Sequence, residues 1–234
     1  MVVSELNCSS CVTTSTGRLN WGYHLVEPPV LDSLSTLSRI PNRRDLMVVG
    51  GTALSLYCYE KFPTGIRETD DVDVSSREYL TRSQFNAGIG LEIYHILEKM
   101  GYQPNIMRSH KDFTVRVVEQ TELNDAFYIC VSRRSRKYRE IAEKRILREF
   151  ENAVELNVPE TENKVFVARF EDVLAPKIQM MREKDVRDIK AVLKFGPEPD
   201  MKYLEDALVI WSGGSELTAN EHLEKFKRIK TEAK

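Results

Sequence analysis

The chain has 234 residues, 41% of them hydrophobic and 30% charged, which is enough for one sizeable core with an appendage or for two small domains. Its 34 lysine and arginine residues nearly balance 36 acidic residues, so a uniformly basic nucleic-acid coat is excluded while a local basic face is not. No apolar run approaches the ~20 residues that cross a bilayer, and the start of the sequence lacks the apolar segment of a secretory signal.

Residues 1–20 are expected to form a flexible N-terminal arm, because they are rich in serine and threonine and show no helical or strand period. Cys8 and Cys11 form a C-x-x-C pair in this arm, but one pair supplies only two of the four ligands of a structural zinc site. The other cysteines, Cys58 and Cys130, complete no disulfide framework. We therefore expect a cytoplasmic protein whose thiols stay reduced.

Residues 21–168 are expected to form one α/β core, because helical and strand patterns alternate along them. Helices are indicated where apolar residues recur every three or four positions, and strands where short apolar or alternating runs are bounded by turn residues. In chain order the predicted elements are a helix at 28–40, a strand at 45–49, a helix at 52–62, a strand at 71–75, a helix at 89–100, a hairpin of strands at 113–118 and 126–132, a basic helix at 133–150, and short strands at 153–157 and 164–168.

Residues 169–234 are expected to form a helical C-terminal region. The segment Gly-Pro-Glu-Pro at 196–199 breaks the helical pattern near its middle. The last helix carries a capping-box pattern from Thr218 to Glu221. The predicted helices of this region cover 170–181, 185–195, 200–211 and 218–232.

The first chemical motif is a buried strand that ends in two glycines and is followed by two aspartates on a later strand. Gly50 and Gly51 let the backbone approach a ligand, and the free N–H groups at the start of the next helix attract phosphate. Asp71 and Asp73 flank Val72, so their carboxylates face one side of the predicted strand. A divalent cation relieves their mutual repulsion, and oxygen-only ligands favour Mg²⁺ or Mn²⁺. A phosphate cradle beside paired carboxylates is the minimum arrangement for nucleotidyl transfer.

A second motif lies in the C-terminal region, at residues 170–189. It contains Lys177 and Asp188, which are eleven residues apart and would lie roughly 16 Å apart along one continuous helix. Both side chains can reach one site only if the chain turns near residues 183–184. Asp185 is then a candidate N-cap of the helix that follows the turn.

The two motifs resemble the nucleotidyltransferase superfamily, and most closely its AbiEii/AbiGii toxin-type members. The family segments G-G-T-A-L and R-x-T-x-D-[ILV]-D are matched by residues 50–54 and 67–73. The segments E-D-L-[IL]-A-x-K-[IL] and R-x-K-D-x-x-D-[IL] are matched by residues 171–178, with valine for the first leucine, and 182–189. The resemblance covers residues 45–195 and implies a mixed-sheet core of the DNA polymerase β type with a helical C-terminal region.

The resemblance implies an enzyme that transfers a nucleoside monophosphate from a nucleoside triphosphate to an acceptor. It implies that Asp71 and Asp73 hold Mg²⁺ or Mn²⁺ and that Lys177 neutralises charge on the triphosphate. The implied nucleotide-binding residues are Gly50, Gly51, Thr52, Arg67 and Lys177. The implied catalytic residues are Asp71, Asp73, Lys177 and Asp188.

One departure from the superfamily concerns a third acidic residue on a later strand. The matching strand here, at 126–132, contains no acid. Asp125 lies just before this strand and can be the third acidic residue only if the strand register is shifted. The other interpretation of Asp125 is a turn residue. Asp188 is the alternative source of a third carboxylate.

The acceptor and the partner follow from the resemblance alone. It implies transfer to an RNA end, such as that of tRNA, or to a protein hydroxyl, by the toxin of a toxin–antitoxin pair that an antitoxin protein blocks. The basic segment at 133–148 is then either a solvated helix face or a groove for an RNA backbone. The alternative functions are transfer to a small molecule, as in aminoglycoside nucleotidyltransferases, and a non-catalytic nucleotide-binding or interaction module.

Overall fold

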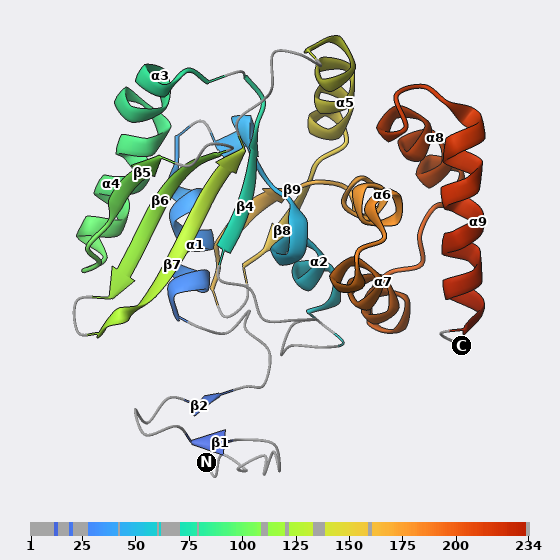
Figure 1. Ribbon diagram of the computed structural model, residues 1–234. Coiled ribbons are helices and arrows are strands. Elements are labelled where there is room, and N and C mark those ends of the chain that lie inside the picture. Colours follow the sequence, from blue (N-terminus) through green and yellow to red (C-terminus); the bar gives the residue numbers. More distant parts are fainter. Residues whose placement is uncertain are drawn as a thin grey trace.

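The computed structural model describes residues 12–13, 19–20, 28–41, 43–59, 61, 71–78, 80–108, 112–119, 122–132, 139–158 and 161–232. A mixed β-sheet forms its centre, helices pack around the sheet, and a group of helices forms the C-terminal end (Figure 1). The predicted α/β class, with a mixed-sheet core followed by a helical region, is confirmed.

The described α-helices are α1 (Pro28–Arg39), α2 (Gly50–Cys58), α3 (Arg82–Ala87), α4 (Ile89–Lys99), α5 (Arg139–Glu151), α6 (Phe170–Met180), α7 (Glu183–Phe195), α8 (Met201–Trp211) and α9 (Glu216–Glu232). The described strands are β1 (Val12–Thr13), β2 (Leu19–Asn20), β3 (Leu46–Val48), β4 (Asp71–Ser76), β5 (Asn105–Arg108), β6 (Asp112–Glu119), β7 (Glu122–Ser132), β8 (Val154–Asn157) and β9 (Lys164–Val167). None of the described helices combines the length and apolar composition needed to cross a membrane.

Seven strands form the main sheet, in the order β5-β6-β7-β4-β3-β9-β8. The central strand β4 is parallel to β7 and antiparallel to β3, and β3 is in turn parallel to β9. The pairs β5–β6, β6–β7 and β8–β9 are antiparallel, and β1 pairs with β2 apart from this sheet. The two aspartates of the first motif therefore lie on the middle strand and not on an exposed edge.

The core face of the sheet is built from every second residue of its central strands. Val72 and Val74 of β4, Ile129 of β7 and Val115 of β6 are fully buried. Helices α1 and α4 pack on this face, with α1 against β4 and β9 and α4 against β5 and β6 (Figure 1). Because side chains alternate along a strand, the intervening residues point to the opposite face.

The short elements α3 and β5 were not predicted, and neither were the two-residue strands β1 and β2 within the expected arm. With six residues or fewer, none of them is long enough for a periodic signal to stand out. The start of α3 does carry a sequence signal, a capping box in which Thr81 and Gln84 each bond the other's backbone N–H.

Three helix starts differ from the prediction by two residues, those of α2, α7 and α9, and α7 begins at Glu183 and not at Asp185. Helix α2 begins at Gly50 and not at Thr52, so the two glycines form its first turn. Helix α9 begins at Glu216, where the Ser215 hydroxyl accepts a hydrogen bond from the N–H of Thr218 at 3.3 Å. The capping box assigned to Thr218 is therefore wrong, because Thr218 already lies inside the helix.

Helix α6 is the central helix of the C-terminal region, since it contacts α2, α7, α8 and α9. Leu174 and Ile178 of α6, Leu204 and Leu208 of α8 and Phe226 of α9 are fully buried. Each such side chain stabilises the fold by about 1.5–3 kcal/mol relative to exposure. These residues belong to the same apolar cluster as the sheet, so the helical region shares one core with it.

Tyr203 of α8 connects α5, α6 and α8. Its hydroxyl donates to the Asp172 carboxylate at 2.8 Å, and its backbone carbonyl accepts from Arg148 at 3.0 Å. The guanidinium groups of Arg148 and Arg169 lie 4.1 and 3.8 Å from the centre of its ring. Burial raises the pKa of the Asp172 carboxyl, and the Tyr203 hydrogen bond and the Arg148 charge oppose that rise. The Asp172 charge thus depends on these two partners.

Along the chain, β9 is the last strand of the sheet, and the later regular elements in the described part of the chain are all helices. The boundary between residues 168 and 169 stays a prediction. So does the N-terminal arm, because only residues 12–13 and 19–20 of its twenty are described. Cys8 and Cys11 lie outside the described residues.

We predict that Tyr203→Phe lowers the free energy of unfolding by about 1–3 kcal/mol, because the buried Asp172 carboxylate loses its hydroxyl donor. Urea unfolding followed by circular dichroism measures the change. Tyr94→Phe is the matched control, since Tyr94 is half-buried on α4 and its hydroxyl makes no hydrogen bond to a described residue. Equal unfolding midpoints for the two variants would contradict the prediction.

Candidate active site

The junction between β3 and α2 places the start of a helix beside β4. The N–H of Val49, the N-cap residue, donates to the carbonyl of Asp73 at 2.9 Å. Val49 offers no side-chain hydrogen bond to the first turn of α2, and that turn contains no acidic residue. The N–H groups of this turn, with the positive end of the helix dipole, are therefore available to an anion.

At Gly50, the first turn of α2 lies close against β4. The Gly50 φ of 71° lies in the left-handed region, which favours glycine. A Cβ at this position would lie 3.1 Å from Cβ and 3.2 Å from Cγ of Asp73, and closer still to Oδ2. The Asp73 carboxylate therefore lies against the first turn of α2, and a residue larger than glycine would displace it.

Asp71 and Asp73 project from the same face of β4 as half-buried side chains. The Thr52 hydroxyl donates to the backbone carbonyl of Asp71 at 3.1 Å, which fixes the start of β4 against α2. Two carboxylates on one strand face provide the oxygen donors that a hard divalent cation prefers. The position of Asp73 against Gly50, with Asp71 on the same face of β4, fits Mg²⁺ or Mn²⁺ next to phosphate.

Strand β7, the parallel neighbour of β4, supplies no carboxylate at the level of Asp71 and Asp73. The register pairs Asp71 with Tyr128 and Asp73 with Cys130. Asp125 stands three positions before Tyr128, so the register is not shifted in the way that a third acid on β7 requires. Within the described ranges, no group of three or more His, Cys, Asp or Glu residues is arranged to hold a metal.

Two polar residues that no sequence motif singled out lie in the same row as Asp71. Strand β6 pairs Arg116 with Tyr128, and β7 pairs Tyr128 with Asp71. Both side chains are half-buried. Only the strand register identifies them. The expected hairpin contained both strands but placed the connection at 119–125, whereas β7 already begins at Glu122.

The turn between α6 and α7 brings Lys177 and Asp188 together. After α6 ends, Met181 adopts a left-handed conformation with φ 48° and ψ 31°, and α7 begins at Glu183. Lys177 Nζ then lies 2.6 Å from Asp188 Oδ2, and both side chains are buried. The chain turns just before residues 183–184, where the sequence required a turn.

Asp185 also joins this pair, but not as an N-cap. Arg182 is the N-cap of α7 and Asp185 its third residue, so the N-cap assignment is wrong. Arg182 Nε and Nη2 donate to the Asp185 carboxylate at 2.6 and 3.1 Å, and Lys177 Nζ lies 3.9 Å from Oδ1. Burial raises the pKa of this carboxyl, but the Arg182 hydrogen bonds and the Lys177 charge outweigh burial and lower it. We call Lys177, Arg182, Asp185 and Asp188 the C-terminal ion cluster.

Helix α2 connects the aspartate site to the helices that carry this cluster. It contacts β4, α6 and α7, and Figure 1 shows it between the sheet and the C-terminal helices. At its last turn, the Tyr57 hydroxyl donates to the Ala168 carbonyl at 2.9 Å, and the Tyr57 ring centre lies 5.2 Å from that of Phe170. Its nine residues span about 13 Å, so both groups of charged residues belong to elements packed on one short helix.

The remaining sequence candidates are only partly described. Arg67 lies outside the described residues, as does the stretch 133–138 of the basic segment. Farther along that segment, the Arg145 guanidinium stacks over the Trp211 ring at 4.0 Å, and Arg148 bonds to Tyr203. These two arginines attach α5 to α8.

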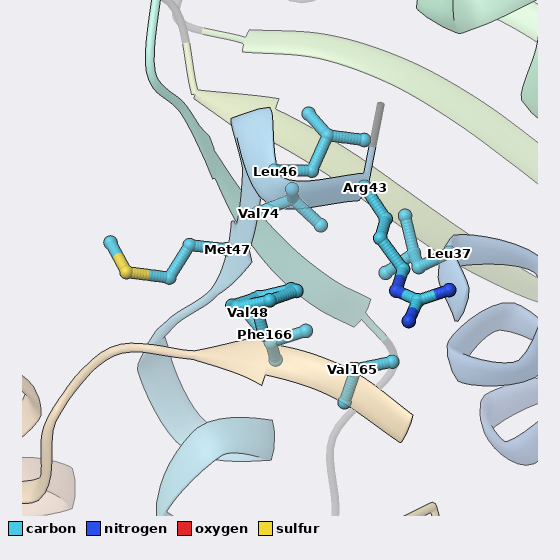
Figure 2. Close-up of a pocket in the computed structure, with 8 residues that line it drawn as sticks. All are labelled: Leu37, Arg43, Leu46, Met47, Val48, Val74, Val165 and Phe166. Atoms are coloured by element: carbon cyan, nitrogen blue, oxygen red, sulfur yellow. The ribbon is translucent and has the colours of Figure 1, made fainter. Parts of the chain in front are cut away.

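A small apolar cavity lies on the core side of the sheet, away from the aspartates (Figure 2). Its walls come from α1, β3, β4, β9 and the segment before β3. It contains no carboxylate, so it is a feature of core packing and not the candidate site. It is lined by Leu37, Arg43, Leu46, Met47, Val48, Val74, Val165 and Phe166.

Comparison with known proteins gives matches only among solved structures: no family model matches the sequence, and no curated protein matches it. The chain is similar to the nucleotidyltransferase toxin MenT4 from Mycobacterium tuberculosis, at 14% identity and a TM-score of 0.49, over 78% of this chain and 62% of that one. It is also similar to an antigenic nucleotidyltransferase-like protein from Paracoccidioides brasiliensis, at 16% identity and a TM-score of 0.48, over 83% of this chain and 92% of that one. The chain thus spans less than two thirds of the toxin's length. At these identities the function has to be argued from the site itself.

We predict that Gly50→Ala destabilises the fold more than Gly101→Ala and also weakens Mn²⁺ binding. Both glycines have positive φ, 71° and 92°, so alanine is strained at each by about 1–2 kcal/mol. Only at position 50 does the added Cβ meet Asp73, because nothing lies within 4 Å at position 101. Urea unfolding and Mn²⁺ titration by electron paramagnetic resonance measure the two effects. Equal losses of stability and unchanged Mn²⁺ affinity would contradict the described contact.

We predict that Lys177→Met costs about 3–5 kcal/mol of stability, because two buried carboxylates, Asp185 and Asp188, lose their shared cation. Adding Asp188→Leu to that variant restores part of the loss, and a double-mutant cycle from urea unfolding gives the coupling. Lys184→Met, at an exposed position of α7, is the control. A cost for Lys177→Met as small as that of the control would show that the cluster is not the ion pair described here.

Proposed function

We propose that this chain is a Mg²⁺- or Mn²⁺-dependent nucleotidyltransferase, which moves a nucleoside monophosphate from a nucleoside triphosphate to an acceptor. The contact between Gly50 and Asp73 is the observation that supports the proposal most directly. It places the start of α2, which has no side-chain cap, next to the face of β4 that carries both aspartates. The helix start attracts phosphate, and the carboxylates attract a hard divalent cation. A nucleoside triphosphate with its cation offers both partners.

The triphosphate is proposed to bind at the first turn of α2. Gly50 and Gly51 have no side chains to keep phosphate oxygens from the backbone N–H groups. The Thr52 hydroxyl is already bonded to the Asp71 carbonyl, so Thr52 contributes its N–H to the phosphate and its hydroxyl to the site's framework. Arg67 is proposed to add a further phosphate contact, as the sequence motif implies.

The proposed reaction is an in-line displacement at the α-phosphorus. The acceptor hydroxyl oxygen forms a bond to the α-phosphorus. At the same time, the bond between the α-phosphorus and the oxygen that bridges it to the β-phosphate breaks. Pyrophosphate leaves with the electron pair of that bond, and the hydroxyl proton passes to water. Asp71 and Asp73 hold the divalent cation, whose positive charge offsets the negative charge on the attacking and leaving oxygens. Because β4 fixes both carboxylates, little reorganisation accompanies the reaction.

Lys177 is proposed to balance charge on the triphosphate, with Asp188 and Asp185 as its positioning residues. Only 7% of Lys177 is exposed, and the two carboxylates fix the place of its ammonium group. Arg182 compensates the remaining charge on Asp185. The position of Lys177 on α6 is thereby set by side chains of α7 and its N-cap, across the α6–α7 turn.

The finer assignments rest on the sequence resemblance. We propose that the acceptor is an RNA end, such as that of tRNA, or a protein hydroxyl, and that the chain acts in the cytoplasm as a toxin blocked by an antitoxin protein. The small-molecule acceptor and the non-catalytic module are the competing functions, and the following assay distinguishes them.

We predict that the purified protein transfers label from an α-³²P nucleoside triphosphate in the presence of Mg²⁺ and total RNA. The variant Asp71→Asn with Asp73→Asn should lower the rate about 100-fold or more, because the charge stabilisation at the site is lost. The pair Glu78→Gln with Glu92→Gln, two exposed acids elsewhere, is the matched control and should keep the rate.

The position of the label decides between the acceptors. Label in RNA or in protein, from wild type and the control pair alone, supports the proposal. Label in neither, with nucleotide binding that Asp71→Asn and Asp73→Asn abolish, would favour a small-molecule acceptor. Binding of nucleotide that does not depend on the aspartates would support the non-catalytic module.

A further inference from the structure

The face of the sheet that carries the aspartates extends beyond β4 as two rows of side chains. One row runs from Asp71 through Tyr128 and Arg116 to Asn105, across β4, β7, β6 and β5. The adjacent row consists of Asp73, Cys130, Thr114 and Met107. The carboxylates therefore lie at one end of a surface that continues away from α2.

Alternation with the buried core residues assigns these rows to the face opposite α1 and α4, although Thr114 in the second row is itself buried. Val72, Ile129 and Val115 alternate with them along the three strands and are fully buried. Tyr128 and Arg116 are half-buried, like the aspartates. In Figure 1, α1 and α4 lie behind the strands, and none of the described helices lies in front of β6 and β7.

Arg116 brings a positive charge to this face. It forms no ion pair or hydrogen bond with any side chain that the structure describes. Its Cα lies two strand spacings from that of Asp71, about 10 Å. Tyr128 lies between them in the row, and its hydroxyl makes no hydrogen bond to a residue that the structure describes. A half-buried arginine beside an aromatic ring, next to two carboxylates, suits an anionic and planar ligand.

The two flanks of the aspartates differ in what they offer. On the β3 flank lies the start of α2, where the triphosphate is proposed to bind. On the β7 flank lie Tyr128 and Arg116. In-line displacement places the attacking and leaving oxygens on opposite sides of the phosphorus. If pyrophosphate leaves on the α2 flank, the acceptor approaches along β7.

We propose that Tyr128 and Arg116 form the acceptor subsite, and that it binds the phosphate-bearing terminal nucleotide of an RNA. The guanidinium binds the phosphate through paired N–H donors, and the ring stacks on the base. This inference rests on the proposed nucleotidyl transfer and adds the acceptor to it. An RNA end fits the subsite, whereas a cationic aminoglycoside is repelled by Arg116.

The test measures RNA binding and transfer separately. A fluorescently labelled oligoribonucleotide is titrated with wild type, Arg116→Gln, Arg116→Lys, Tyr128→Leu and Arg39→Gln, followed by anisotropy at several salt concentrations. Arg39 is an exposed arginine on α1, on the other side of the sheet, and serves as the control. Transfer kinetics on the same RNA give KM for RNA and for the nucleotide, and thermal melting checks that each variant is folded.

Arg116→Gln should weaken RNA binding about 10-fold and lower the slope of log affinity against log salt by about one, because one phosphate contact is lost. Arg116→Lys should recover part of the affinity, since the charge returns without the paired donors. Tyr128→Leu should weaken binding with little change in the salt slope, because stacking carries no charge. KM for the nucleotide should stay unchanged in all variants.

Unchanged RNA affinity in both Arg116→Gln and Tyr128→Leu would overturn the subsite, as would a rise in KM for the nucleotide in place of RNA. Label transferred to protein alone, by a wild type that does not bind RNA, would overturn it as well. A different outcome is that wild type binds RNA but transfers no label, and that Arg116→Gln weakens this binding. That outcome would overturn the proposed reaction and would support the RNA-binding surface. The two proposals therefore fail in distinguishable ways.

Discussion

The whole site depends on a glycine that leaves room for a carboxylate. A side chain at Gly50 would approach Asp73 to 3.1 Å between Cβ atoms, and a φ of 71° already favours glycine there. Because Gly50 has no side chain, α2 can follow the end of β3 after a single intervening residue, with its first turn against β4. The neighbouring contacts, the Val49 N–H to Asp73 and the Thr52 hydroxyl to Asp71, secure the same junction. Helix start and carboxylates are thus one rigid unit.

The second physical feature is the packing of both groups of charged residues around one buried helix, α2. Nearly all of α2 is buried, from Gly51 to Leu56 and again at Cys58, which makes it an interior helix. The aspartates lie against its start, and the C-terminal ion cluster lies on two of the helices that pack on it. In such surroundings the effective dielectric is low, so each charged group acts more strongly than in water and needs a close partner. The short Lys177–Asp188 contact satisfies that need within the cluster.

The sequence was informative where a local pattern determines the structure. Alternation placed Asp71 and Asp73 on one face of β4, and the distance along a helix required a turn between Lys177 and Asp188. It was uninformative where the outcome depends on contacts between distant segments. The row from Asp71 to Arg116 exists only through strand register, and β6 carries an irregularity between Val118 and Glu119 that no composition reveals. Long-range packing likewise occupies Arg145 and Arg148, two residues of a basic segment that composition alone leaves open as an RNA groove or a solvated face.

The parallel pairing of β3 with β9 also determines when the site is completed during synthesis. Val48 at the end of β3 pairs with Val167, more than a hundred residues later, and its carbonyl accepts from the N–H of Ala168 at 3.0 Å. Contacts between residues so far apart form late, since the intervening chain has to be closed into a loop first. On the ribosome, the strand that leads into α2 gains this neighbour only after residue 168 has emerged, and α6 and α7 follow later still. A nascent chain or a truncated product that lacks these segments therefore has the local contacts between α2 and β4, but not the packing of β9, α6 and α7 that supports β3 and α2 from the other side.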